Sequence, residues 1–326
     1  MIKIISGKLK NPSGGFKLSH LAVEGHIEAE DLEGSQLQPY IKHTKVLDAD
    51  HFLISTDSDF SWGLDGRLIL SGSLEYRGDP SFHSSTKTRQ GALNYKLQWV
   101  GDMLEVKEAV LKLGDFQFNG HGKIEQIRSE QPKIIFTARS NSMPVDKIHQ
   151  YIPFSNFPKL MHRAQKILRR GQVEIRSLKF DGTLNQLTQL NHPSNLAHLS
   201  GEVGLENVDW DLNFFKLHKI SGVFLLAGGD GTIRIKKAFY RSASKVTLEG
   251  VIKNAIFDPL GDLNLIGQIK LPELKKLLVK EIKNPKFHGM LDQFENISGL
   301  GTMHLHFLGS LQDINRLSVD GKYSFK

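Results

Sequence analysis

Apolar and polar residues alternate with a period of two along most of this chain. Clear examples are residues 67–76 (RLILSGSLEY), 172–176 (QVEIR), 232–236 (TIRIK) and 245–250 (KVTLEG). Successive side chains of a β-strand point to opposite faces, so each segment places apolar side chains on one face and polar side chains on the other. Turn signals such as Gly101-Asp102 and Asp181-Gly182 separate the segments. The pattern predicts about sixteen strands.

Strands with one apolar and one polar face are typical of an antiparallel sheet with one wetted side. We therefore predict a mainly β fold, a long curved antiparallel sheet shaped like a gutter, with a few short amphipathic helices. The apolar face of such a sheet has to be covered. A sandwich or a closed barrel would cover it with more sheet. An open gutter would instead leave a groove whose apolar concave side holds something else.

Two segments have helical periodicity and a basic face. Residues 158–170 (PKLMHRAQKILRR) are followed by Gly171 as a stop signal, and residues 272–283 (PELKKLLVKEIK) begin with a proline in the first turn. One interpretation is a helix docked on the sheet with a solvated basic face. The other is contact with an anionic membrane surface, where each cation is worth about 1 kcal/mol. The candidate cations are Lys159, Arg163, Lys166, Arg169, Arg170, Lys275, Lys276 and Lys280.

The chain contains an internal repeat with an offset of about 128–130 residues. Residues 99–122 match residues 227–250, so that Leu104, Val106 and Ala109 correspond to Ile233, Ile235 and Ala238, and Phe116, Phe118 and Gly120 to Val246, Leu248 and Gly250. Residues 23–41 look like a partial third copy. We therefore predict three β-groove segments: residues 1–98, residues 99–198 with the first basic helix, and residues 199–326.

The composition excludes several classes of protein. The 326 residues include no Cys, which rules out disulfides, thiolate zinc sites, Fe–S clusters and cysteine catalysis. The net charge of +7 favours anionic partners, namely lipid headgroups, nucleic acid or an acidic protein. No segment approaches the ~18 apolar residues of a membrane span, and no signal peptide is recognisable. We expect a soluble chain or a piece of a protein that is anchored elsewhere.

The order of predicted elements is similar to that of a known family. A glycine-acid turn, two strands, and then a strand, a proline and a short helix follow one another in residues 228–255 (GGDGTIRIKKAFYRSASKVTLEGVIKNA) and 261–278 (GDLNLIGQIKLPELKKLL). Residues 199–212 (LSGEVGLENVDWDL) precede them in the expected order. This arrangement resembles the AsmA-like family of bacterial envelope proteins with a repeating β-groove. The resemblance covers most of the chain. The family's usual transmembrane helix is not recognisable in this sequence.

The resemblance implies a non-enzymatic protein that binds phospholipids or conducts their acyl chains along an apolar β-groove. It implies a place in the periplasm, or attached to the inner membrane, of a Gram-negative envelope, and it implies no catalytic residues and no cofactor. The implied partners are phospholipids. From the basic helices we also expect an anionic membrane surface as a partner, and we do not expect nucleic acid. It also implies that the sequence is part of a longer, membrane-anchored chain.

The alternation of apolar and polar residues predicts which side chains would line the groove. The apolar positions of the predicted strands are Leu111, Leu113, Phe116, Phe118, Ile134, Phe136, Val173, Ile175, Val203, Leu205, Val223, Leu225, Ile233, Ile235, Val246, Leu248, Leu263 and Leu265. Each buried methylene of an acyl chain would gain ~0.8 kcal/mol without directional specificity. Chains could slide along such a wall because neighbouring positions are equivalent.

Other function classes have weaker support in the sequence. Gly228–Gly231 is glycine-rich but lies between two strands, whereas a phosphate-binding loop opens a helix. His304 and His306 share a strand face and could bind zinc with a third ligand, but they oppose Met303 and Phe307 and are expected to face solvent. Most Phe residues fall at apolar positions, away from the cations, which argues against binding of nucleic acid. A structural scaffold with a filled core remains the alternative function.

Overall fold

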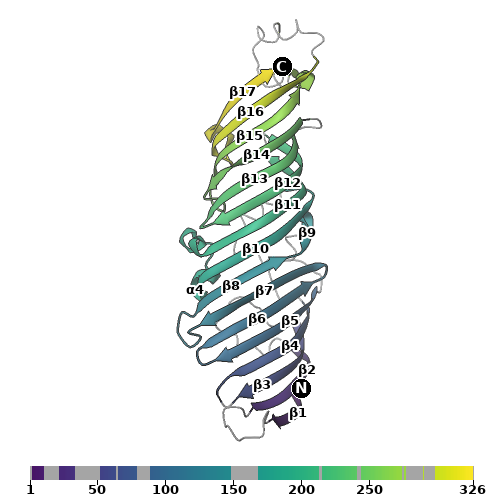
Figure 1. Ribbon diagram of the computed structural model, residues 1–326, viewed down its shortest axis with the longest axis vertical. Helices are drawn as coiled ribbons and strands as arrows, with labels where there is room; N and C mark the ends of the chain where they lie inside the picture. Colours follow the sequence, from purple (N-terminus) through teal and green to yellow (C-terminus); the bar gives the residue numbers. More distant parts are fainter. Residues whose placement is uncertain are drawn as a thin grey trace. The chain divides into compact units, whose positions relative to one another are not determined.

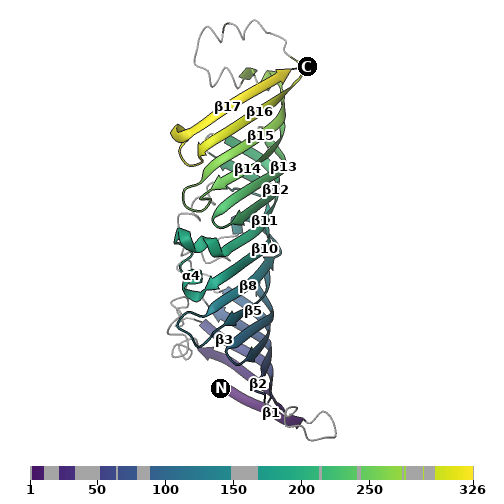
Figure 2. The same ribbon diagram turned by 60° about the vertical axis from the view of Figure 1, so that its left-hand side comes forward.

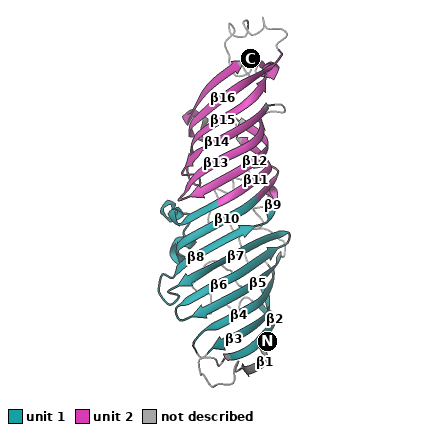
Figure 3. Ribbon diagram, viewed as in Figure 1, with its two compact units in different colours: residues 1–143, 147–158, 174–201 teal, residues 144–146, 159–173, 202–326 magenta. Residues whose placement is uncertain are grey.

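The computed structural model describes residues 2–10, 22–33, 52–63, 65–78, 89–147, 168–212, 215–240, 244–273, 275–276, 289 and 298–325. The chain divides into two compact units (Figure 3). Unit 1 takes in residues 1–143, 147–158 and 174–201, and unit 2 takes in residues 144–146, 159–173 and 202–326. Each unit is built around an antiparallel sheet, and the two are described in turn.

The sheet of unit 1 is a meander in which each strand pairs with the next one in the chain (Figure 1). Its strands are β1 (Ile2–Lys10), β2 (Ala22–Glu33), β3 (Phe52–Gly63), β4 (Leu68–Gly78), β5 (Arg89–Val100), β6 (Met103–Leu113), β7 (Phe116–Glu125), β8 (Lys133–Ser140) and β10 (Gln172–Thr183). Strand β8 pairs with β10. The short β9 (Ser142–Pro144) and the 3₁₀ turn η4 (Val145–Lys147) have residues in both units. So does β10, whose residues 172–173 belong to unit 2, and so does the next strand, whose residues 199–201 belong to unit 1.

The sheet of unit 2 follows the same rule. Its strands are β11 (Leu199–Leu212), β12 (Phe215–Ala227), β13 (Asp230–Tyr240), β14 (Ser244–Lys253), β15 (Leu260–Lys270), β16 (Leu300–Ser310) and β17 (Leu317–Phe325), with the 3₁₀ turn η7 (Ile314–Arg316) between the last two. From β12 to β17, each strand pairs antiparallel with the next. The expected fold class is confirmed: the chain is mainly β, with an open antiparallel sheet that does not close into a barrel and few short helices.

One end of the unit 1 sheet is covered by a helical segment that follows β10. Helix α4 (Leu184–Thr188) is capped by Thr183. The Thr183 hydroxyl accepts the Gln186 backbone N–H, and the Gln186 side chain accepts the Thr183 backbone N–H, so both of these N–H groups at the start of the helix have a partner. The 3₁₀ helix η6 (Pro193–His198) returns the chain to the sheet, where His198 lies 6.3 Å from the ring of Phe180. Phe180 is only 1% exposed. Figure 2 shows α4 directly beyond the end of β10.

The predicted helix at residues 158–170 is wrong at its C-terminal end. Leu168 forms an antiparallel bridge with Trp210 of β11, the Arg169 N–H donates to the Asp209 carbonyl, and the Asp209 N–H donates to the Arg170 carbonyl, each at 3.0 Å. The backbone groups of these residues are satisfied by the edge of a strand instead of by a helical turn. Gly171 does not end a helix. Its φ of +103° and its lack of a side chain let the backbone lie close to Asn207 and Val208, where a Cβ would clash.

The second predicted helix starts where its proline indicated. Residues 271–273 and 275–276 are helical, and the Leu271 N–H donates to the Gly299 carbonyl at 3.1 Å. Lys276 is exposed, and Lys275 is half-buried. Lys159, Arg163, Lys166 and Lys280 lie outside the described residues. The membrane contact of these cations stays a prediction.

The two hairpins of the predicted repeat share a local geometry. Asp102, in the turn before β6, accepts the Arg128 N–H at 3.1 Å, and Asp230, at the start of β13, accepts the Asn254 N–H at 3.0 Å. Both strand pairs carry a register irregularity at the same place, next to Ala109 in β6 and next to Ala238 in β13. The first strands therefore correspond as predicted.

The second strands of the repeat correspond with a shift. Ala109 pairs with Gly120, and Ala238 pairs with Val246, so Gly120 takes the place of Val246 rather than of Gly250. The reason is that fewer residues separate Ala238 from Val246 than separate Ala109 from Gly120. The predicted boundary between residues 98 and 99 falls inside β5, and the one between residues 198 and 199 falls at the start of β11. The three-segment division stays a prediction about repeats.

Candidate functional site

The register of unit 1 gathers apolar side chains into rows that cross the sheet. Residues that pair directly across an antiparallel sheet point to the same face. One row consists of Trp62, Leu68, Trp99, Leu104, Ile124 and Ile134, one residue from each strand from β3 to β8. A second row consists of Leu74, Leu93, Leu111 and Phe118. We call this side of the sheet the apolar face of unit 1.

Much of the apolar face of unit 1 is accessible. Trp62 is 59% exposed and Trp99 is 38% exposed, and Trp99 donates its indole N–H to the Gly101 carbonyl at 2.8 Å. Leu74, Leu93 and Leu111 are half-buried. An exposed row of large apolar side chains is typical of a surface that binds a ligand or a partner. This face is therefore the candidate site.

Six predicted groove residues belong to this face. Between β6 and β7, Leu111 pairs with Phe118 and Leu113 pairs with Phe116. Between β7 and β8, Ile134 pairs with Ile124 and Phe136 pairs with Gly122, and these two β7 residues in turn pair with β6. Phe116 is 3% exposed, whereas the other five predicted residues are half-buried. Phe136 stacks on Phe180 with ring centroids 5.8 Å apart, near the part of the face that η6 covers. These six side chains therefore share one face of the sheet, while their contact with a ligand stays a prediction.

Six other predicted groove residues form a buried face in unit 2. The register aligns Ile233, Ile235, Val246, Leu248, Leu263 and Leu265 on one side of the sheet. Their exposed fractions are only 0–3%. Side chains with so little accessible surface stabilise the fold as a core, and an acyl chain would find no surface to contact at these positions. The apolar face of unit 2 is thus filled where that of unit 1 is accessible.

The remaining six predicted residues are divided. Val223 pairs with Arg234 and Leu225 pairs with Thr232, which places both on the polar face, whereas their neighbour Phe224 pairs with Ile233. The prediction chose the wrong parity here because residues 223–226 are all apolar, so that alternation gives no face. Val173 is 3% exposed, and Ile175, Val203 and Leu205 are half-buried.

The prediction missed residues of β3 and β5 on the accessible face. Two of the three tryptophans lie there, at alternate positions of residues 52–63 and 89–100. The sequence could have identified both tryptophans, because each alternates in phase with the other apolar residues of its strand and so belongs to the same face. Polar residues interrupt that phase in β3, where Thr56 and Ser58 occupy positions of the apolar face.

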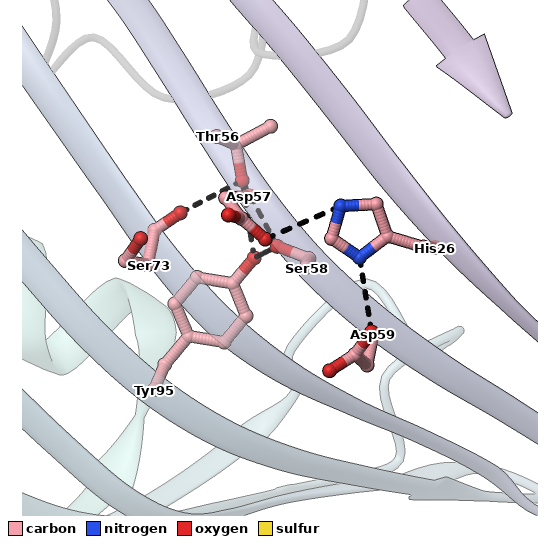
Figure 4. A network of polar contacts seen from close by, with 7 residues as sticks. All are labelled: His26, Thr56, Asp57, Ser58, Asp59, Ser73 and Tyr95. Carbon is pink, nitrogen blue, oxygen red and sulfur yellow. Dashed lines mark hydrogen bonds and ion pairs between the residues drawn. The ribbon is translucent and has the colours of Figure 1, made fainter. Parts of the chain in front are cut away.

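The opposite, polar face of unit 1 carries an ion-pair cluster on β2 and β3. His26 Nδ1 lies 3.0 Å from Asp59 Oδ1, and His26 Nε2 lies 3.4 Å from Asp57 Oδ1 (Figure 4). The hydrogen bond to Asp59 is the largest cause that raises the pKa of His26 above its ordinary value. Burial opposes it, and the charges of Asp57, Asp59 and Glu28 raise the pKa further. The cluster links two neighbouring strands on the wetted side of the sheet.

We expect the pKa of His26 to lie above 6.5 in the folded chain and to fall when Asp59 is replaced by Asn. A raised folded pKa means that the ion pair stabilises the fold below the ordinary pKa, and that this contribution is lost as pH rises through the raised value. The check is an NMR titration of the histidine ring, assigned with His26→Gln. An unchanged pKa in Asp59→Asn would contradict the assigned cause.

The two histidines considered as zinc ligands lie on β16 of unit 2. His304 and His306 pair with Lys322 and Asp320 on the polar face, as predicted, and His306 Nε2 lies 2.8 Å from Asp262 Oδ1. Across the described parts of the chain, no three potential metal ligands come together. In the same parts, no helix is long and apolar enough to cross a membrane.

Comparison with family models, with curated proteins and with solved structures found no match to this chain. The case for a function therefore depends on the geometry of the apolar face of unit 1.

Proposed function

We propose that the apolar face of unit 1 binds acyl chains of phospholipids and lets them slide along the sheet, without catalysis. The observation that carries this proposal is the accessible row that runs from Trp62 through Trp99 to Leu104. Exposing such side chains to water costs free energy, which a bound acyl chain recovers. The resemblance of the sequence to AsmA-like envelope proteins supports the same function and a place in a bacterial envelope.

The energetics favour a bound chain that is held without a fixed position. Contact with leucine and aromatic side chains gains ~0.8 kcal/mol for each methylene removed from water. The rows repeat from strand to strand, so Leu74, Leu93 and Leu111 offer a chain nearly equivalent contacts. Movement by one strand spacing, about 4.8 Å, exchanges one such contact for another. This equivalence suits conduction better than selective storage.

A scaffold role is the second candidate, and it applies to unit 2. The filled core there, with Leu265 and Met303 at 0% exposure, supports a structural element rather than a second binding surface. In this arrangement unit 1 would bind lipid, and unit 2 would provide stability and protein contacts. Apolar residues on its polar face, such as Leu308 at 50% exposure, would serve those contacts.

Native mass spectrometry of the full chain, purified from a Gram-negative host without detergent, tests the proposal. We expect adducts with the masses of phospholipids, confirmed by lipid extraction and fragmentation. The physical reason is that an accessible apolar face retains acyl chains from the membranes of the host. A single mass equal to that of the polypeptide, with no extractable lipid, would leave the scaffold role as the better account.

A further inference from the structure

A small polar cluster lies within the apolar face of unit 1. It consists of the hydroxyls of Thr56 and Ser58 on β3 and of Tyr95 on β5 (Figure 4). The register places all three on the apolar face, because Thr56 pairs with Leu74, Ser58 pairs with Gly72, and Gly72 pairs with Tyr95. Ser58 is 3% exposed, and Tyr95 is half-buried. Polar groups on such a face are costly unless they are paired.

Gly72 makes the cluster possible. It lies on β4 between Ser58 and Tyr95, and a Cβ at this position would come within 2.6 Å of Ser58 Cα. Because no side chain stands between them, the Tyr95 ring crosses β4 and brings its Oη to 2.6 Å from Ser58 Oγ. A larger residue at position 72 would separate the two hydroxyls.

The direction of the hydrogen bonds in the cluster follows from the contact of Thr56 with a backbone carbonyl. The Thr56 hydroxyl lies 3.0 Å from the Ser73 carbonyl, which can only accept, so Thr56 donates its single proton there. Thr56 Oγ1 then accepts from Ser58 Oγ at 3.0 Å, and Ser58 Oγ accepts from Tyr95 Oη at 2.6 Å. All three hydroxyl protons are used. The reverse order would replace the 3.0 Å bond from Ser58 to Thr56 with one from Tyr95 to Thr56 at 3.5 Å, which is long for a bond between hydroxyls, so the distances favour the first order.

The hydrogen-bonding capacity that remains unused in this order is an acceptor lone pair on Tyr95 Oη. A phenol oxygen accepts as well as donates. We propose that Tyr95 accepts a hydrogen bond from the free hydroxyl of an uncharged lipid, such as a diacylglycerol, whose acyl chains lie along the apolar face. This site rests on the proposed lipid-binding function and gives it a preference. An anionic headgroup needs donors, and the cluster has none to offer.

The size of the preference follows from one neutral hydrogen bond. Such a bond contributes about 0.5–1.5 kcal/mol net. A lipid with a free hydroxyl should therefore be enriched roughly two- to twelvefold over the same lipid with that hydroxyl capped. The preference is independent of total lipid uptake, which the surrounding apolar side chains determine.

The test uses a competition between two matched lipids. Vesicles of phosphatidylcholine carry equal amounts of 1,2-dioleoylglycerol and of its 3-acetyl ester, and the full chain is incubated with them and separated. Mass spectrometry then gives the ratio of the two lipids on the protein. We expect the wild type to favour the free hydroxyl and Tyr95→Phe to bring the ratio close to one with similar total uptake. Tyr76→Phe, which removes another phenol from the same face, should keep the wild-type ratio.

Each outcome decides between the proposals. Uptake of both lipids in equal amounts by the wild type, or a preference that Tyr95→Phe leaves unchanged, would overturn the Tyr95 site while the lipid-binding function stands. Uptake of neither lipid would overturn both. A preference lost in Tyr95→Phe and kept in Tyr76→Phe would support the site.

Discussion

Replacing Leu93 by Asp should remove co-purifying lipid almost completely. Leu93 lies in the middle of the apolar face of unit 1, between Leu74 of β4 and Leu111 of β6. A carboxylate there would have to lose its water beneath a bound acyl chain, at a cost of at least about 2–3 kcal/mol, which is roughly a hundredfold loss of affinity. Native mass spectrometry of the purified variant measures the loss.

Two control variants separate this effect from other causes. Asn94→Asp adds the same charge to the next residue of β5, which is exposed on the polar face and pairs with Ser73 and Val110, so lipid binding should be retained. Leu93→Asn has nearly the shape of the aspartate variant without its charge and should lose less lipid. Equal lipid content in Leu93→Asp and Asn94→Asp would show that acyl chains do not contact this face.

Replacing Leu265 by Ala should destabilise unit 2 strongly. Leu265 is 0% exposed and pairs with Leu248 of β14 and Leu305 of β16. Truncation of a fully buried leucine removes contacts and leaves a cavity, at a cost of about 2–5 kcal/mol. Urea denaturation measures the change, followed by the fluorescence of Trp210 in a background in which Trp62 and Trp99 are Phe.

The adjacent residue provides the matched control. Ile266 is 41% exposed on the opposite face of β15, so Ile266→Ala should cost less than about 1 kcal/mol. Similar losses in the two variants would mean that Leu265 is no more buried in solution than Ile266. In that case the face of unit 2 would be as accessible as that of unit 1, and the division of roles between the units would be wrong.

The period of the sequence was sufficient to predict the fold class. In β13, Ile233 and Ile235 alternate with Thr232 and Arg234, and this alternation places each side chain on a defined face. The prediction of faces was wrong at Val223 and Leu225, where consecutive apolar residues carry no phase. It also missed the end of the 158–170 segment, since Leu168 pairs with a strand distant in sequence, and such a contact overrides local helix propensity.

The accessibility of the apolar face could not be predicted from the sequence. Leu111 and Leu248 both occupy apolar positions of alternating strands, yet one is half-buried and the other is 3% exposed. Burial depends on what lies over each face, and local periodicity holds no information about it. The cluster of Thr56, Ser58 and Tyr95 was equally hidden, because it depends on the register of three strands.

Quenching of tryptophan fluorescence by lipids with brominated acyl chains tests the central claim most directly. Bromine quenches a tryptophan only on contact, and the chain carries reporters on both sheets: Trp99 on the apolar face of unit 1 and Trp210 in unit 2. In variants that retain one of the two and have Phe at the other tryptophan positions, the account predicts strong quenching of Trp99 and little quenching of Trp210. Bound brominated lipid that leaves Trp99 emission unchanged, or that quenches Trp210 equally, would contradict it.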